Sequence, residues 1–351
     1  MRFPGSKSEM SEDLASAVRR FEMGLYDLAA GEFTKILTQN PRDGVARHYL
    51  LLTQRRLFAR PAPAPALVWQ FNPDEAWERD WLRSLLGGIV AREVVDNTWS
   101  HVSDPMIVVD NRLVEAKVPY YRQAFERGAR IILVHLSDEA FRNDTGAYQY
   151  CEAVIRNYRS EILAESSRIF FFPLGCKAGF ITAGRVPKPA AARRHLWSFA
   201  GDVKKFTRAE MLEAMSSLGE GFRHLTEGFN TTDCLPIGDY RALLDETVIV
   251  PCPGGWSNLE TFRVYEALEA GCIPIVERRP GFDYFTDLLG PHPMPTIVRW
   301  REAADLVRQL QAEDRLEVTR QACAAWWQSY KPSLTQSLAD FVRRALDPSA
   351  V

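Results

Sequence analysis

The most informative part of the chain is Thr247–Val276, which reads TVIVPCPGGWSNLETFRVYEALEAGCIPIV. An apolar run leads to a glycine-bearing turn, a stretch of helical periodicity and a second apolar run, which predicts strand, turn, helix and strand. Ser257 and Glu260 have the spacing of a capping box, so we expect the helix to begin at Ser257. In an open parallel sheet, a helix N-terminus beside Gly254 and Gly255 is a natural seat for phosphate.

Arg263 and Glu266 lie one turn apart on this predicted helix. A guanidinium pairs with phosphate oxygens in a fork, and a carboxylate can accept hydrogen bonds from both vicinal hydroxyls of a ribose. The pair therefore predicts a holder for a nucleoside diphosphate. An ordinary turn at the two glycines and a surface ion pair on the helix are the open alternatives.

Residues 1–58 are predicted to be helical. Apolar residues recur there at three- and four-residue steps. Gly24, Tyr26, Ala29 and Phe33 have the spacing of the second half of a tetratricopeptide repeat, with a plain helical hairpin as the alternative. Because such repeats normally need about three copies to stand alone, we expect this TPR-like segment to pack on the next domain or on a protein partner.

Two α/β lobes are expected after a proline-rich linker at residues 59–66, ARPAPAPA. Apolar and helical stretches alternate in residues 67–190 and again in residues 191–351, which is typical of parallel sheets covered by helices. The expected strands are 67–71, 106–109, 130–136, 168–172, 195–200, 247–251 and 272–276, and the expected helices are 75–86, 120–128, 148–162, 208–218, 259–270, 302–314 and 333–346. An interlobe connection is expected at Arg185–Arg194, and an apolar turn at Trp326, Trp327 and Tyr330 before the last helix.

Composition excludes several classes of protein. The 351 residues are 46% hydrophobic and 25% charged with a net charge of −2, which suits a globular protein and not a polycationic nucleic-acid binder. The six cysteines form no C-x-x-C pair, so we expect reduced thiols in the cytoplasm and no zinc site. No run approaches the ~20 apolar residues of a membrane span, and any membrane association is expected to be peripheral.

The spacing Arg-x-x-Glu-Ala-x-x-x-Gly-Cys-Ile-Pro, from Arg263 to Pro274, resembles the signature of exostosin-type glycosyltransferases. The resemblance extends to Pro253, Gly255 and Thr261, and to the segment WSFAGDVKK at 197–205. In the first lobe, HLSDE at 135–139, RNY at 156–158 and PLGCKAGF at 173–180 are similar to bacterial members and to the ribitol xylosyltransferase branch.

This resemblance implies a GT-B type fold of two Rossmann-like lobes, a nucleotide-sugar donor, expected to be UDP-linked, and inversion at the anomeric carbon. We expect the second lobe to hold the donor. The expected donor-binding residues are Gly201, Lys204, Lys205, Gly254, Gly255, Ser257, Asn258, Arg263 and Glu266.

No metal or other cofactor is expected. No two aspartates of the chain are two residues apart, so the Asp-x-Asp metal motif of the other major transferase fold is missing. The charge of the departing diphosphate must then be met by helix amides and by basic side chains such as Arg263, Lys204 and Lys205. The alternative for the two lysines is that they are simply solvated.

An inverting transfer needs a base that takes the proton of the acceptor hydroxyl. Asp138 or Glu139, just past the predicted strand, is the expected base, although Asp138 can instead cap the next helix. His135 is the third candidate, with a packed core histidine as its alternative. Lys177 and Arg156 are expected contacts to the diphosphate or the acceptor.

Other functions remain open from the sequence alone. A nucleotide-sugar epimerase or a glycosyl hydrolase can be built on a similar two-lobed scaffold, because a fold does not fix chemistry. A non-catalytic scaffold that keeps a nucleotide site and gathers partners through its helical N-terminus is the hypothesis from another class. For the transferase, the acceptor is expected to be a glycan, such as a bacterial cell-surface polysaccharide.

Overall fold

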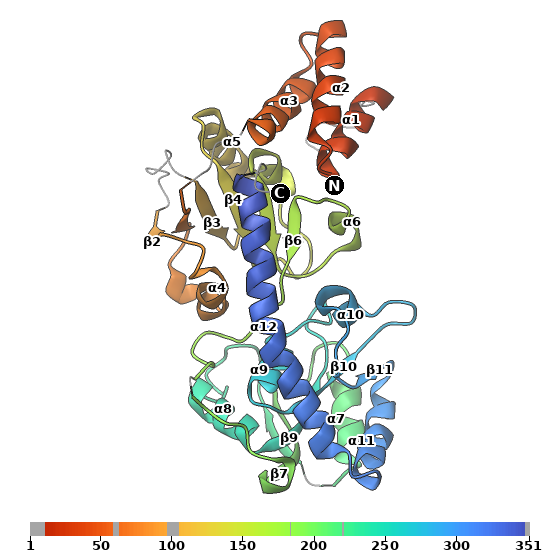
Figure 1. Cartoon of the computed structure of the whole chain (residues 1–351). Coiled ribbons are helices and arrows are strands. Elements are labelled where there is room, and N and C mark those ends of the chain that lie inside the picture. The colour runs from red at the N-terminus through yellow and green to blue at the C-terminus, as the bar shows by residue number, and fades with distance from the viewer. Residues whose placement is uncertain (1–10, 59–62, 97–104, 183, 220, 348–351) are drawn as a thin grey trace. The chain divides into compact units, whose positions relative to one another are not determined.

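The computed structural model describes residues 11–58, 63–96, 105–182, 184–219 and 221–347 (Figure 1). The chain divides into two compact units. Unit 1 comprises Met1–Glu75, Leu86–Phe172 and Thr335–Val351, and unit 2 comprises Ala76–Leu85 and Pro173–Leu334. Residues 59–62 of the predicted linker lie outside the described residues.

The N-terminal part of unit 1 is helical, as the sequence predicts. It contains α1 (Glu12–Glu22), α2 (Tyr26–Gln39) and α3 (Gly44–Leu57). Their apolar faces form one core with Phe125 of the α/β part of the same unit. Buried Arg56 pairs with Glu152 at 3.3 Å and donates to the carbonyl of Ala345, so these helices are fixed to the rest of unit 1 by polar as well as apolar contacts.

The sheet of unit 1 is parallel, with strand order β2-β1-β3-β4-β5-β6. The strands are β1 (Ala66–Trp69), β2 (Arg92–Val95), β3 (Met106–Asp110), β4 (Ile131–His135), β5 (Ala153–Arg156) and β6 (Ile169–Phe171), and the helices of this part include α5 (Val118–Glu126) and α6 (Glu161–Ala164). Helix α4 (Arg79–Leu86) belongs to unit 2 except for Leu86. Every residue of β1, β3, β4 and β5 is buried, which is why these strands are short apolar runs without alternation.

The helix predicted at residues 148–162 is wrong. This stretch contains the end of a 3-10 helix at Thr145–Tyr150, then strand β5 and the beginning of α6. Buried strand β5 pairs with β4 on one side and β6 on the other. A short buried apolar run cannot be told from a buried helix by periodicity, and here the tertiary pairing decides.

The sheet of unit 2 is also parallel, with order β11-β10-β9-β7-β8. The strands are β7 (His195–Gly201), β8 (Phe222–Leu225), β9 (Thr247–Cys252), β10 (Ile273–Glu277) and β11 (Thr296–Ile297), and the helices are α7 (Arg208–Ser216), α8 (Ile237–Asp245), α9 (Phe262–Glu269), α10 (Tyr284–Leu289) and α11 (Ala303–Ala312). The sequence prediction missed β8, β11, α8 and α10. The two missed strands are short and lie at the sheet edges, where a buried run is not required.

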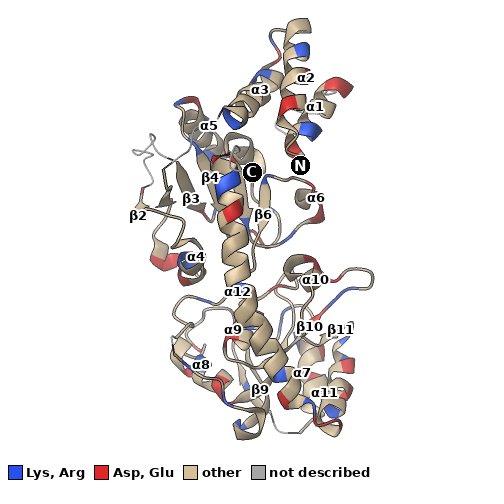
Figure 2. Ribbon diagram, viewed as in Figure 1, with Lys and Arg blue, Asp and Glu red and all other residues tan. Residues whose placement is uncertain are grey.

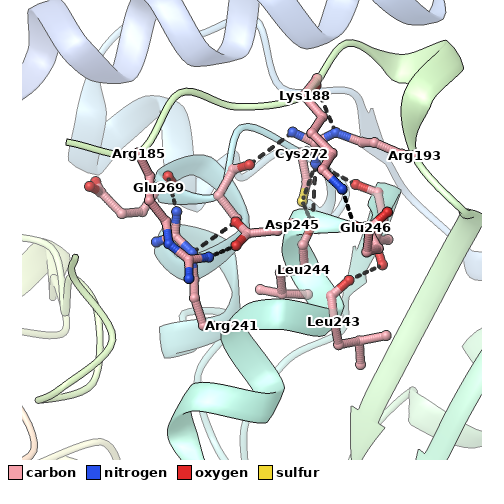
Figure 3. A network of polar contacts seen from close by, with 12 residues as sticks. Arg185, Lys188, Arg193, Arg241, Leu243, Leu244, Asp245, Glu246, Glu269 and Cys272 are labelled. Atoms are coloured by element: carbon pink, nitrogen blue, oxygen red, sulfur yellow. Dashed lines mark hydrogen bonds and ion pairs between the residues drawn. The ribbon is translucent and has the colours of Figure 1, made fainter. Parts of the chain in front are cut away.

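The connection predicted at Arg185–Arg194 is bound firmly to unit 2 (Figure 3). Arg193 is buried and donates to the carbonyl oxygens of Thr247 at 2.6 Å and Ala270 at 2.9 Å. Arg185 and Lys188 form ion pairs with Asp245 and Glu246 at the end of α8. One guanidinium thus satisfies carbonyls from two parts of the sheet framework.

The C-terminal helix α12 (Leu316–Leu346) is longer than predicted. It is continuous through Trp326, Trp327 and Tyr330, so the apolar turn expected there is wrong, and it contains Pro332. The rings of Trp326, Trp327 and Tyr330 stack on one another with centroids 5.0 to 6.1 Å apart. This packing holds the turns before the proline in helical form.

Charged residues of both signs occur along the ribbon of each unit (Figure 2). Among the described residues, no helix combines the length and the apolar character that crossing a bilayer requires.

Candidate functional site

The strand order of unit 2 indicates a ligand site at the carboxyl ends of its strands. From β7 the chain goes to β8 on one side and then returns to β9 on the other side of β7. The loops that follow β7 and β9 therefore diverge from neighbouring strand ends. In open parallel sheets such a switch point is where ligands bind.

The end of β7 is shaped around Arg263. Gly201 has a φ of 144°, and an added Cβ would lie 2.8 Å from Nη2 of Arg263. That Nη2 donates to the carbonyl of Ala200 at 2.7 Å, and the guanidinium lies 4.5 Å from the ring centroid of Phe199. The buried Nε of Arg263 has no hydrogen-bond partner. A side chain at position 201 would shift the guanidinium of Arg263, and the φ of 144° itself favours glycine there.

The helix after β9 does not begin at Ser257, so that prediction is wrong. Helix α9 begins at Phe262, with Thr261 as its N-cap, and no side chain caps it. Glu260 does not close a capping box. Its carboxylate accepts hydrogen bonds from the amide of Leu174 at 2.8 Å and from two buried tyrosine hydroxyls, those of Tyr265 and Tyr284. These distant partners bind the side chain more fully than a local cap would.

The two glycine amides of the β9–α9 loop are bonded within the protein. Gly254 N donates to Glu277 at 3.2 Å, and Gly255 N donates to the carbonyl of Asn258 at 2.8 Å. The buried side chain of Asn258 accepts a hydrogen bond from the amide of Glu260 through its Oδ1. The loop is therefore pinned at its base, and its amides at 254 and 255 are not the ones left for a phosphate.

The start of α9 holds two of the buried polar side-chain atoms that lack a hydrogen-bond partner in the described part of the chain. Both Thr261 Oγ1 and Arg263 Nε are buried without a hydrogen bond in the described chain. Each is a group whose burial costs free energy unless it is bonded. The amide of Val264, in the first helical turn, is bonded to the carbonyl of Thr261 at 3.2 Å, so Thr261 Oγ1 and Arg263 Nε are the candidate donors at the switch point.

Glu266 is bound to the chain itself. It is buried, and its Oε1 accepts the amide of Lys177 at 3.3 Å. Burial raises the pKa of Glu266 to about 7, against the opposing effects of Arg263 and of hydrogen bonds from Lys177 and Tyr240. The carboxyl thus fixes the segment that carries Lys177, whose Nζ donates to Asn230 at 2.8 Å.

The two predicted lysines differ. Lys204 is exposed, and its amide donates to Asp202 at 2.7 Å. Lys205 is buried, and its Nζ lies 5.1 Å from the ring centroid of Trp256 and 5.5 Å from that of Phe229. Ser257 is exposed next to Trp256. Sequence reasoning missed Trp256 and Phe229, although an aromatic residue in the loop after the predicted strand 247–251 was a usable signal for Trp256.

In unit 1, Asp138 has both carboxylate oxygens in use. Oδ1 accepts hydrogen bonds from the amides of Arg142 and Asn143 at 2.8 and 3.2 Å, and Oδ2 accepts one from the guanidinium of Arg156 at 3.3 Å. This is the structural role that the sequence left open for Asp138. Arg156 is buried in the same ion pair, while Glu139 is partly exposed.

His135 is buried at the end of β4. Its Nδ1 lies 2.6 Å from the hydroxyl of Tyr148, and that hydroxyl also accepts a hydrogen bond from Arg156 at 3.0 Å. The ring proton lies on Nε2 if the tyrosine hydrogen is donated to Nδ1, and on Nδ1 if the tyrosine oxygen accepts from it. Burial lowers the pKa of His135 well below its ordinary value, and Arg156 and Lys117 act in the same direction. This buried, bonded ring fits the packed core histidine that the sequence left as the alternative to a base.

No group of three His, Cys, Asp or Glu side chains suited to a metal ion occurs within residues 11–58, 63–96, 105–182, 184–219 and 221–347.

Two parallel α/β sheets, with the switch point in unit 2, define a GT-B type glycosyltransferase fold. Residues 189–346 match the family model described as RXYLT1 C-terminal domain, which supports the exostosin-like resemblance. That the chain is a bacterial-type member and that its N-terminus is TPR-like stay predictions. No curated protein sequence matches the chain.

The solved structures that are similar to this chain include several glycosyltransferases. A variant of the Thermobaculum terrenum O-GlcNAc transferase aligns with a TM-score of 0.51 at 12% identity over 95% of this chain and 83% of that one. An α1,3-fucosyltransferase aligns with a TM-score of 0.49 at 12% identity over 82% and 90%. Anabaena HepE, solved with UDP, aligns with a TM-score of 0.46 at 11% identity over 79% and 99%. At such identities the likeness concerns the fold alone.

Proposed function

We propose that this chain is a glycosyltransferase that moves a sugar from a nucleotide donor, UDP-linked, to a hydroxyl group of a glycan acceptor. The transfer is inverting and needs no metal ion. The GT-B type fold and the family match over residues 189–346 support the transferase class. A cell-surface polysaccharide is the acceptor that the family resemblance favours.

The observation that carries this proposal is the start of α9. Thr261 Oγ1 and Arg263 Nε are buried there without partners. A diphosphate supplies acceptors for both of these donors, and the positive end of the helix favours its charge. The polar groups that are unsatisfied in the free protein thus become bonded when the donor binds.

Cationic side chains of unit 2 support the metal-free part of the proposal. Arg263 lies at the end of β7, and Lys205 and Lys177 both approach the ring of Phe229. Fixed cations of this kind can stabilise the charge of a departing diphosphate where a metal ion would otherwise do so. For the acceptor, Glu139 is the base that we propose, because both oxygens of Asp138 are engaged.

Calorimetric titration of the full chain with UDP and with GDP tests the proposal. Arg263→Ala is expected to weaken binding of the preferred nucleotide by about 10- to 150-fold, the range for a hydrogen bond to a charged group. Arg308→Ala is the matched control, because Arg308 is an exposed arginine paired with Asp305 on α11. A wild-type chain that binds neither nucleotide, or a folded Arg263→Ala variant with unchanged affinity, contradicts the proposal.

A further inference from the structure

Four exposed aromatic rings gather at the loops of unit 2. Trp77, Phe206, Phe229 and Trp256 are 38, 52, 46 and 66% exposed. They come from separate segments, since Phe206 follows β7, Phe229 follows β8, Trp256 follows β9 and Trp77 precedes α4. Complete burial of such a side chain is worth about 1.5 to 3 kcal/mol, and each of these rings forgoes a part of it, so an exposed cluster of this size indicates a binding surface.

The rings are connected through contacts. Trp77 and Phe229 meet edge to face with centroids 4.7 Å apart. Lys205 Nζ lies 5.5 Å from the Phe229 centroid and 5.1 Å from the Trp256 centroid, so it links the two rings. Phe206 lies against Gly254, since an added Cβ there would be 3.3 Å from its ring. These four rings, called the aromatic cluster below, thus lie on the loops that follow β7, β8 and β9 and on the segment before α4.

Backbone strain accompanies the cluster. Phe206 has a φ of 44°, and Asn230, which follows Phe229, has a φ of 60°. A left-handed conformation is uncommon for a bulky residue such as phenylalanine. Such strain persists where the surrounding structure imposes it and is concentrated at ligand sites.

Trp256 stands out within the cluster. It is the most exposed of the four rings, and it lies with Ser257 at the tip of a loop that the Gly255 to Asn258 hydrogen bond closes. The loop belongs to the same β9–α9 connection as Thr261 and Arg263. A rigid, pinned tip that presents an indole ring beside a cation suits a flat, polar, aromatic ligand.

We propose that Trp256 is the stacking surface for the nucleobase of the donor, and that Lys205 holds the indole ring through their cation–π contact. This inference rests on the proposed function, because the diphosphate at the start of α9 sets where the nucleoside begins. From there the base extends along the β9–α9 connection to the loop tip. Trp256 then determines affinity for the nucleoside part, and Arg263 determines affinity for the diphosphate.

Calorimetric titrations with UDP, GDP and inorganic pyrophosphate separate these two contributions. Trp256→Ala is expected to weaken nucleotide binding by about 5- to 150-fold, the range for losing one stacked base, and to leave pyrophosphate affinity unchanged. Trp256→Phe is expected to restore most of the affinity because it keeps a ring. Phe58→Ala, which removes an exposed ring of unit 1, is the control and is expected to bind as the wild type does.

Three outcomes overturn the inference. If Trp256→Ala binds nucleotide normally while Arg263→Ala does not, stacking is refuted and the proposed function stands. If Trp256→Ala loses pyrophosphate and nucleotide equally, Trp256 supports the loop and does not contact the base. If the wild-type chain binds neither nucleotide, the proposed function fails and the stacking role fails with it.

Discussion

Replacing Glu266 by glutamine tests the state of a buried carboxyl at the candidate site. Glu266 is 5% exposed, and burial raises its pKa from 4.5 to about 7. Because the folded protein holds this proton more tightly than the unfolded chain does, the stability from this group is complete below about pH 4.5. It is lost as the pH rises through 7. At about 1.4 kcal/mol per pH unit, the difference amounts to about 3 kcal/mol.

Urea unfolding of the full chain at about pH 5 and about pH 8 measures this loss. Between these values the free energy of unfolding of the wild type should fall by about 2 to 3 kcal/mol more than that of Glu266→Gln, since glutamine does not titrate. Glu210→Gln, which changes an exposed carboxylate on α7, is the control and should follow the wild type. Buried Glu78, whose pKa is also raised to about 7, titrates in all three proteins and cancels in the comparison.

Parallel pH profiles for the wild type and Glu266→Gln would refute this reasoning. UDP titrations of the same variants add a functional result. Glutamine keeps an oxygen for the amide of Lys177, so Glu266→Gln should bind UDP nearly as the wild type does, whereas Glu266→Ala should bind it more weakly. If Glu266 instead accepts ribose hydroxyls as an anion, both variants should lose about tenfold or more in affinity.

Three further changes have defined outcomes. Gly175→Ala should lower the free energy of unfolding by about 2 to 5 kcal/mol, because Gly175 has a φ of 69° and an added Cβ would lie 2.3 Å from the Trp81 ring. Gly219→Ala is the control and should cost only about 1 to 2 kcal/mol, because Gly219 has a φ of 95° with open space around it. Equal losses of the two variants in urea unfolding would contradict the clash. Transfer activity should survive excess EDTA, and its loss with recovery on adding manganese would contradict a metal-free mechanism. Asp138→Asn should destabilise the protein by about 3 to 5 kcal/mol, because buried Arg156 loses its charged partner. Glu139→Gln should lower turnover about 100- to 10,000-fold with donor affinity unchanged. Full activity of Glu139→Gln would place the base elsewhere.

Much of the fold could be predicted from the sequence, because apolar runs bounded by turns predict strands in a parallel sheet. Strands β3, β4, β9 and β10 lie within a residue or two of their expected places. Strand β5 was taken for part of a helix because its four buried residues carry no distinguishing period. Edge strands β8 and β11 escaped prediction because so few of their residues are buried.

The site was harder to predict because its contacts join residues far apart in the sequence. Ser257 and Glu260 have the spacing of a capping box, yet Glu260 bonds to Leu174, 86 residues away. Glu266 likewise bonds to Lys177, 89 residues away. Spacing identifies which residue types stand close along the chain, but not which distant donor competes for a carboxylate.

These two carboxylates connect the β9–α9 region to one other segment of unit 2. Glu260 holds the amide of Leu174 and Glu266 holds that of Lys177, so both bind the segment that starts at Pro173. The segment carries Lys177 to the ring of Phe229, within the aromatic cluster. Residues that resemble a nucleotide-binding signature in the sequence therefore act in two ways. In the function that we propose, the start of α9 and Arg263 bind the donor, while the two glutamates fix the segment that carries Lys177.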